Sequence, residues 1–81
     1  MLTNVLKVYL VTANIKDGKP VYLRVVDGRV HHSKWNYDAQ LFRSVAAADS
    51  LVGLAETIEN LEKIEIRCGM VCFPDLFNTT V

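Results

Sequence analysis

The sequence predicts an α+β fold in which a three-stranded antiparallel meander is followed by one helix and a fourth strand (β-β-β-α-β). Two hairpin signals, residues 16–19 and Asp27-Gly28, separate three runs rich in Val, Leu and Tyr. A stretch with helical spacing follows, and residues 63–73 then alternate as a strand does. The 81 residues suit a single domain, 1–81, with the helix packed on one sheet face.

The first strand alternates two sets of side chains. Its even set is Leu6, Val8, Leu10 and Thr12, and its odd set is Lys7, Tyr9, Val11 and Ala13. We expect the even set to face the core because it lacks the lysine.

In the second strand the odd set, Val21, Leu23 and Val25, is the apolar one and should face the core. Asp27-Gly28 predicts a two-residue type I′ turn. Such a turn pairs Val26 with Arg29, Val25 with Val30, Arg24 with His31, Leu23 with His32 and Tyr22 with Ser33. The same alternation would expose Trp35, which indicates a β-bulge near residues 32–33, a strand end there, or a displayed tryptophan.

Residues 37–43 are typical of a tight turn or a single helical turn, and Ser44 is a plausible N-cap for the helix that follows. The predicted core side of this helix carries apolar residues at helical spacing: Ala48, Leu51, Val52, Ala55 and Ile58.

The last strand should place Ile64, Ile66, Cys68, Met70 and Cys72 on the core face. Cys68 is therefore expected to be buried between sheet and helix and unreactive. We expect the strand to run parallel to strands one and three. A place beside strand one, order 4-1-2-3, is favoured over one beside strand three, whose polar run of residues 31–34 is typical of an edge.

Nine basic and nine acidic residues cancel. Residues 1–43 carry a net charge of +4 and residues 44–81 a net charge of −4, which predicts a basic sheet side and an acidic helix side. The N-terminus has no charged region ahead of its apolar run, and no apolar segment approaches the length of a membrane span. These features lead us to expect a soluble cytoplasmic protein.

The sequence offers no catalytic residues, and no metal or cofactor is expected. His31 and His32 are consecutive strand residues that point to opposite faces, so they cannot chelate one ion together. Cys68 and Cys72 would lie about 13 Å apart on an extended strand, too far for a disulfide. We therefore expect a protein that is not an enzyme.

Three stretches of the chain resemble a pattern common among small proteins of phages and mobile elements. They are Val8-Tyr9-Leu10-Val11, Pro20-Val21-Tyr22-Leu23, and Asp38-Ala39-Gln40-Leu41-Phe42-Arg43-Ser44 with Ala47-Ala48 and a strand after it. The resemblance implies the β-β-β-α-β layout and a bacterial or phage intracellular setting. Because such proteins often bind a host protein, it favours a phage-type accessory or inhibitor protein.

The exposed face of the meander is the predicted binding surface. It is expected to carry Tyr9, Val11, Tyr22, Arg24, Val26, Arg29, His31 and Trp35. Aromatic and basic side chains are enriched at protein interfaces and at platforms for single-stranded nucleic acid. A protein partner is preferred, because a net charge of zero weakens attraction to phosphates, and nucleic acid remains the alternative.

The hydrophobic fraction of 51% is slightly high for so small a domain and favours self-association. A homodimer interface is expected at the C-terminal segment, on Val71, Phe73, Leu76 and Phe77. The alternative is a tail that folds back over Tyr9 and Val11.

Overall fold

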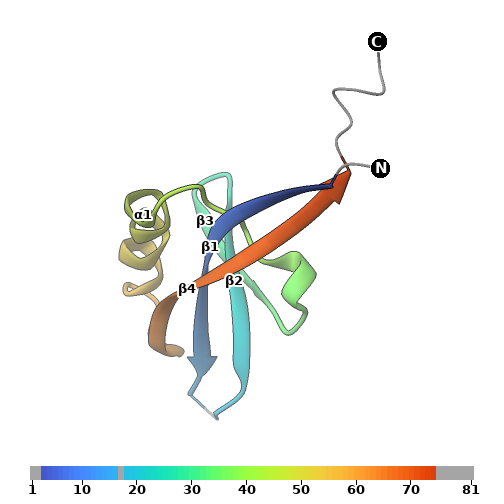
Figure 1. Ribbon diagram of the computed structural model, residues 1–81. Coiled ribbons are helices and arrows are strands. Elements are labelled where there is room, and N and C mark those ends of the chain that lie inside the picture. Colours follow the sequence, from blue (N-terminus) through green and yellow to red (C-terminus); the bar gives the residue numbers. More distant parts are fainter. Residues whose placement is uncertain (1–2, 17, 75–81) are drawn as a thin grey trace.

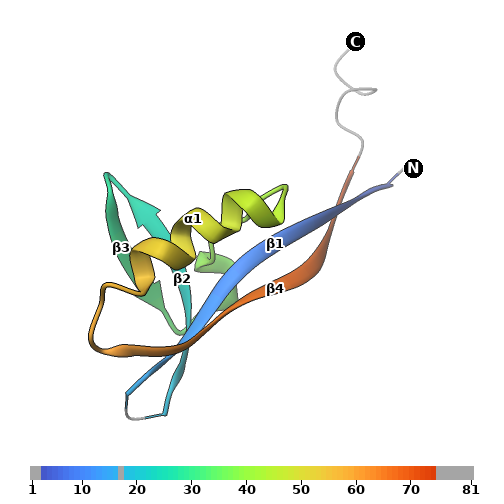
Figure 2. The ribbon, with the colours of Figure 1, turned by 90° about the vertical axis from the view of Figure 1, so that its left-hand side faces the viewer.

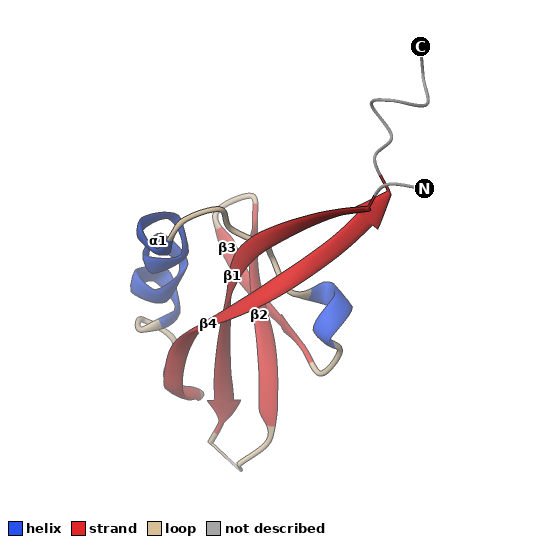
Figure 3. Ribbon diagram, viewed as in Figure 1, coloured by secondary structure: helices blue, strands red, loops and turns tan. Residues whose placement is uncertain are grey.

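The computed structural model describes residues 3–16 and 18–74, with side chains described for residues 5–16 and 18–71. Its elements are β1 (Thr3–Ile15), β2 (Pro20–Val26), β3 (Arg29–Ser33), the 3₁₀ helix η1 (Asn36–Asp38), α1 (Val45–Ala55) and β4 (Leu61–Pro74). Figures 1 and 3 show α1 on one side of the sheet and η1 on the other. The predicted α+β class and the β-β-β-α-β order are confirmed.

The four strands form one sheet in the order β3-β2-β1-β4. The favoured position of the fourth strand beside the first is therefore confirmed. Its predicted direction is wrong, however, because β4 runs antiparallel to β1 over the full pairing from Thr3↔Pro74 to Ile15↔Leu61.

Between β3 and α1 the chain runs once more along the length of the sheet, and this additional segment explains why β4 is antiparallel to β1 (Figure 1). β1 and β2 pair only at Thr12↔Tyr22, Ala13↔Val21 and Asn14↔Pro20, and beyond these pairs residues 40–42 are inserted between them. Gln40 donates its backbone N–H to the Leu23 carbonyl at 3.1 Å, and Phe42 exchanges two 2.8 Å backbone hydrogen bonds with Tyr9. This inserted segment (residues 40–42) runs up the sheet before α1 runs down it, so β4 runs up again (Figure 1).

The turn between β2 and β3 has the predicted type I′ geometry. Asp27 and Gly28 both have positive φ, 51° and 77°, as the two central residues of this turn require. All five predicted pairs from Val26↔Arg29 to Tyr22↔Ser33 are present. Val30 packs against the core, and the strand ends at Ser33, which was one of the alternatives left open for the region before Trp35.

The core-facing set of β1 is the odd one, contrary to prediction. Val11 and Ala13 are buried in the main core cluster, and Tyr9 and Ile15 pack against it. Val8, of the even set, is also buried but lies outside that cluster. Because Ala13 pairs with Val21, the odd sets of both strands share one face.

Helix α1 covers this face as predicted. The Ser44 hydroxyl accepts a 3.1 Å hydrogen bond from the Ala47 backbone N–H, which confirms Ser44 as the N-cap. Ala48, Leu51 and Ala55 are buried, and Val52 and Ile58 pack against the core. Figure 2 views the molecule from the helix side, with α1 in front of the sheet.

A β-bulge shapes the start of β4. Lys63 has a φ of 51°, and the pairing shifts between Thr12↔Glu65 and Asn14↔Glu62, so two residues of β4 lie opposite Ala13. The extra residue allows both Leu61 and Ile64, which have opposite parity, to face the core.

The N-terminal part of β1 and the C-terminal part of β4 extend beyond the other strands. They form a two-stranded ribbon, seen at the upper right of Figure 1. We call this ribbon the arm; it consists of residues 3–8 paired with residues 69–74. The expected burial of Cys68 under the helix is wrong, since Cys68 at the base of the arm is exposed and Met70 is 67% exposed. The helix covers β4 only as far as Ile66, which packs against the core.

Candidate interaction surface

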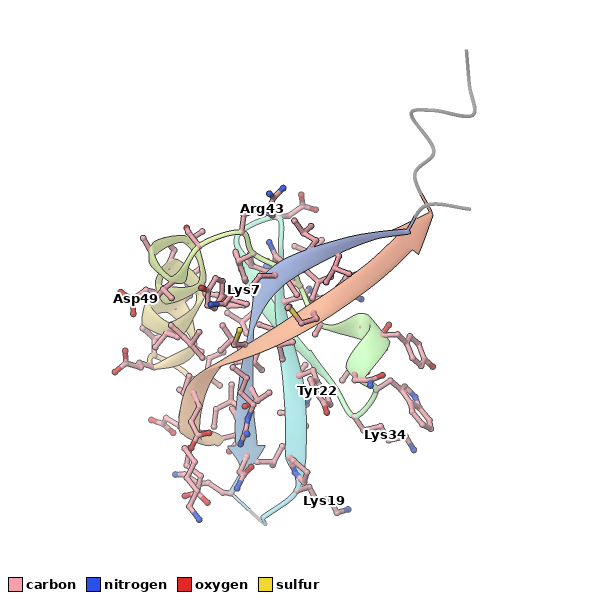
Figure 4. The ribbon with its side chains drawn as sticks, in the orientation of Figure 1. Lys7, Lys19, Tyr22, Lys34, Arg43 and Asp49 are labelled. Atoms are coloured by element: carbon pink, nitrogen blue, oxygen red, sulfur yellow. The ribbon has the colours of Figure 1, made fainter. Side chains whose placement is uncertain are left out.

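The sheet face opposite α1 is covered in the described part of the chain only by the short 3₁₀ helix η1, which lies beside the end of β3 (Figure 1). We call it the open face and define it by the side chains that alternate away from the core. These are Thr12, Tyr22, Arg24, Val26, Arg29, His31, Ser33, Glu65 and Arg67. In Figure 4 the labelled side chains of Lys19, Tyr22 and Lys34 lie on this side, whereas Asp49 lies on the outer side of α1.

Four of the predicted binding residues lie together on the open face. Arg24 pairs with His31 across the β2–β3 ladder, next to Tyr22↔Ser33 and Val26↔Arg29. Directly opposite residues on one sheet face have Cβ atoms about 5 Å apart, so Tyr22, Arg24, Arg29 and His31 form one patch. Arg24, Arg29 and His31 are exposed, and Tyr22 is half-buried.

Tyr9 is not part of this patch. It packs against the core cluster on the α1 side, with the Lys7 ammonium 5.7 Å from its ring centre. Val11 is buried on the same side. The prediction that Tyr9 and Val11 lie on the exposed face is therefore wrong, and a tail folded over the open face would not reach them.

Trp35 extends the surface beyond the end of β3 and is joined by a residue that the sequence patterns did not single out. Its indole is stacked on the Tyr37 ring, with centroids 5.9 Å apart and an interplanar angle of 14°. Lys34 adds its ammonium 4.9 Å from the centre of the Trp35 ring. The two aromatic residues are 51% and 76% exposed, respectively, so a large aromatic surface faces solvent.

Hydrogen bonds fix the loop that carries these rings. The Ser33 hydroxyl donates to an Asp38 carboxylate oxygen at 2.6 Å and accepts from the Trp35 backbone N–H at 3.1 Å. The Asp38 backbone N–H donates to the Trp35 carbonyl at 3.1 Å. The loop is thus held at both ends, and the aromatic pair is positioned before any partner arrives.

A groove of about 350 Å³ lies next to Tyr22 on the open face. It is lined by Thr12, Ala13, Asn14, Pro20, Val21, Tyr22, Lys63, Glu65 and Arg67. Arg67 donates to the Thr12 hydroxyl at 3.2 Å and forms a 2.9 Å ion pair with Glu65. The groove offers polar groups of both signs beside an aromatic ring, and its β4 residues could not be assigned to it until the strand order was known.

The predicted dimer interface lies mostly outside the described side chains. Val71 is half-buried on the arm. The Phe73 side chain, Leu76 and Phe77 lie outside the part of the chain whose side chains are described. The C-terminal interface therefore stays a prediction.

Within residues 3–16 and 18–74, no three His, Cys, Asp or Glu side chains come together as metal ligands would. His31 and His32 point to opposite faces of β3, as expected from their adjacency. No helix in the described part of the chain has the length and apolar character needed to cross a membrane.

Comparisons of the chain with protein-family models, with curated proteins and with solved structures find no match. The geometry of the open face is therefore the basis for the functional argument.

Proposed function

We propose that this protein is a small protein-interaction module that binds a partner protein through the open face and the adjoining Trp35–Tyr37 loop. The observation that carries the proposal is the stacked aromatic pair, which is exposed yet held in place by the Ser33 hydrogen bonds. Solvent-exposed aromatic rings on a fixed loop offer contact area at little entropic cost on binding.

The composition of the patch also favours a protein partner. Tyr, Trp and Arg are the residue types that dominate binding energy at protein interfaces, and all three occur here within one continuous surface. The groove beside Tyr22 gives a partner's side chain a place to insert. The resemblance to phage-type proteins adds that the partner is a host protein, and this stays a prediction.

A second candidate function is binding of single-stranded nucleic acid by the same surface. It is favoured by one feature, the 76% exposed Tyr37 ring next to Lys34 and Trp35, with Arg24 and Arg29 farther along the β2–β3 hairpin, because bases stack on aromatic rings while cations contact phosphates. Asp38 and Glu65 reduce the positive charge of this surface, which favours the protein partner.

Affinity capture from a bacterial lysate with mass spectrometry tests the first proposal. The test variant is Arg24→Glu/Tyr37→Ala, and the matched control is Leu54→Ser/Glu56→Lys, which changes two exposed residues at the end of α1. We expect one protein to be captured by wild type and by the control, and to be at least tenfold depleted with the test variant. Equal capture by all three baits would contradict the assignment of this surface.

Trp35 provides the test of the alternative, because it is the only tryptophan in the chain. Its fluorescence is followed while an oligonucleotide is added at low and at high salt. Quenching that weakens steeply with salt would support nucleic-acid binding, since phosphate contacts release counterions. We expect no saturable quenching.

A further inference from the structure

The two edge strands of the sheet differ in how well they are protected from pairing with another strand. β3 is short, with five residues, and carries Arg29, His31 and His32. β4 has 14 residues, and its stretch 68–73 contains neither a charge nor a proline. Charges, prolines and short length are the usual means of blocking an edge, so the β4 edge is open to pairing over the arm.

The hydrogen bonds of Tyr9 identify which backbone groups of this edge lack a partner in the sheet. Tyr9 directs both its N–H and its C=O toward Phe42, away from β4. Cys68, which lies opposite Tyr9, is therefore in a non-hydrogen-bonded pair of the antiparallel ladder. Its own N–H and C=O point to the outer edge, and by alternation so do those of Ile66 and Met70.

The side chains of the arm add an apolar driving force. Met70 is 67% exposed and Val5 is 58% exposed on a ribbon of two strands. A two-stranded ribbon cannot cover both of its own faces, and isolated pairs of strands are marginally stable in water. A further strand beside β4 would satisfy the edge and cover part of this surface.

We propose that the outer edge of β4 pairs antiparallel with β4 of a second copy of this chain, about a two-fold axis at Cys68. The two four-stranded sheets then form one continuous eight-stranded sheet. The axis sets Cys68 opposite Cys68 of the second copy and Ile66 opposite its Met70. This interface uses the backbone edge of β4 from Glu65 into the arm, and of the open-face residues it includes only Glu65 and Arg67.

The register follows from the bulge and the charges. The regular part of β4 begins at Glu65, after the bulge at Lys63 and Ile64, and an axis at Cys68 pairs residues 65–71 of both copies without including the bulge. Side chains on the α1 side of this pairing, Ile66, Cys68 and Met70, are all apolar or neutral. On the other side Arg67 faces Gly69, and Glu65 faces Val71, so no like charges meet.

A second copy fits this edge better than an unrelated extended peptide does, because the same segment offers complementary groups to itself. Each outward N–H of Ile66, Cys68 and Met70 meets an outward C=O of the same three residues in reverse order. Two-fold pairing of this kind uses the β4 edge of both chains, and the edges that remain are the short, charged β3 strands and residues 3–8 of β1, which carry Lys7.

Sedimentation velocity on the purified chain tests the proposal at protein concentrations from 1 to 100 μM. Met70→Lys places a charge on the edge, and Met70→Leu is the matched control that keeps an apolar side chain of similar size. We expect a dimer for wild type and for Met70→Leu, and at least a tenfold weaker association for Met70→Lys. Circular dichroism checks that all three are folded, which they should be because Met70 is exposed.

Oxidation with diamide in a Cys72→Ser background tests the register. Directly opposite residues in a hydrogen-bonded pair have Cα atoms about 5.5 Å apart, which is within the span of a disulfide. We expect a covalent dimer through Cys68, and none from the Cys68→Ser variant. A monomer at 100 μM, a dimer that Met70→Lys leaves intact, or a dimer without the Cys68 crosslink would each overturn the proposal.

Discussion

The two halves of the β1–β4 pair share one hydrogen-bonded ladder but have different surroundings. In one half Val11, Ala13 and Leu61 are buried beneath α1, and in the other Val5 and Met70 of the arm face solvent. The alternation of side chains is equally regular in both. The difference shows that a strand pattern fixes which residues share a face, whereas burial depends on what is stacked on that face.

Simple lengths explain where burial ends. An 11-residue helix such as α1 spans about 16 Å at 1.5 Å per residue. A 14-residue strand such as β4 spans about 48 Å at 3.4 Å per residue. One face of β4 therefore extends well past the single helix available to cover it, and the arm is the part that is left over.

The largest test of this contrast compares alanine at a covered and at an uncovered position. Leu23 is fully buried in the core cluster, so Leu23→Ala should lower the free energy of unfolding by about 2–5 kcal/mol. Met70→Ala on the arm should change the stability of the monomer by less than about 0.5 kcal/mol. Urea unfolding followed by circular dichroism at low protein concentration measures both, and equal losses would mean that the arm is packed like the core.

Much of the fold could be predicted because local signals determine it. Asp27-Gly28 accepts positive φ at both turn positions, so the β2–β3 pairing could be written residue by residue. Ser44 and the spacing of Ala48, Leu51 and Ala55 likewise located the helix and its buried side. These features depend on neighbours within a few positions of the chain.

The register of β1 could not be predicted in the same way. Ile15 donates its N–H to the Lys19 carbonyl, and Gly18, with a φ of 96°, donates its N–H to the Ile15 carbonyl, so the pair Asn14↔Pro20 follows directly. If the turn between β1 and β2 were one residue longer or shorter, the pairing would shift by one residue. Such a shift moves every side chain of β1 to the opposite face and would place its even set on the core face. Choosing the face by the position of Lys7 was misleading, because Lys7 lies on the arm, where its side chain is exposed although it shares a face with the buried Val11 and Ala13.

The direction of β4 and the position of Tyr37 on the candidate surface could not be predicted, because they depend on contacts beyond the local side-chain pattern. The inserted segment bonds to β1 and β2 through backbone groups, which leave no mark on the side-chain pattern. Tyr22, Arg24, Arg29 and His31 were grouped correctly because one hairpin holds them. Tyr37 was missed because its exposure depends on η1 and on the Ser33–Asp38 hydrogen bond.

The inserted segment marks the boundary between the two halves, and Gln40 offers a way to weaken it. The Gln40 side-chain oxygen accepts the Val25 backbone N–H at 2.8 Å in a half-buried position. Gln40→Leu leaves that N–H without its acceptor and should lower the free energy of unfolding by about 1–2 kcal/mol. Gln40→Glu keeps an acceptor oxygen and is the matched control.

Amide hydrogen exchange reports where the effect of Gln40→Leu falls. We expect faster exchange at the Val25 N–H in Gln40→Leu, with the β2–β3 turn unchanged. Unchanged exchange at Val25 would show that this side chain does not hold the inserted segment against β2.

The smallest expected effect is at Lys63, where β4 bends as it enters its covered half. The backbone of Lys63 has a φ of 51°, and a residue with a Cβ atom adopts this left-handed conformation at a cost of about 1–2 kcal/mol. Lys63→Gly removes this strain but gives the unfolded chain more freedom, worth about 0.5–1 kcal/mol, so a net gain of between about 0 and 1.5 kcal/mol is expected. Glu62→Gly, one residue earlier and outside the residues with positive φ, relieves no strain and should cost about 0.5–1 kcal/mol. Urea unfolding of the two variants should therefore show changes of opposite sign in the free energy of unfolding at these adjacent positions. A loss of stability in both variants would mean that the bulge is not held in the left-handed conformation in solution.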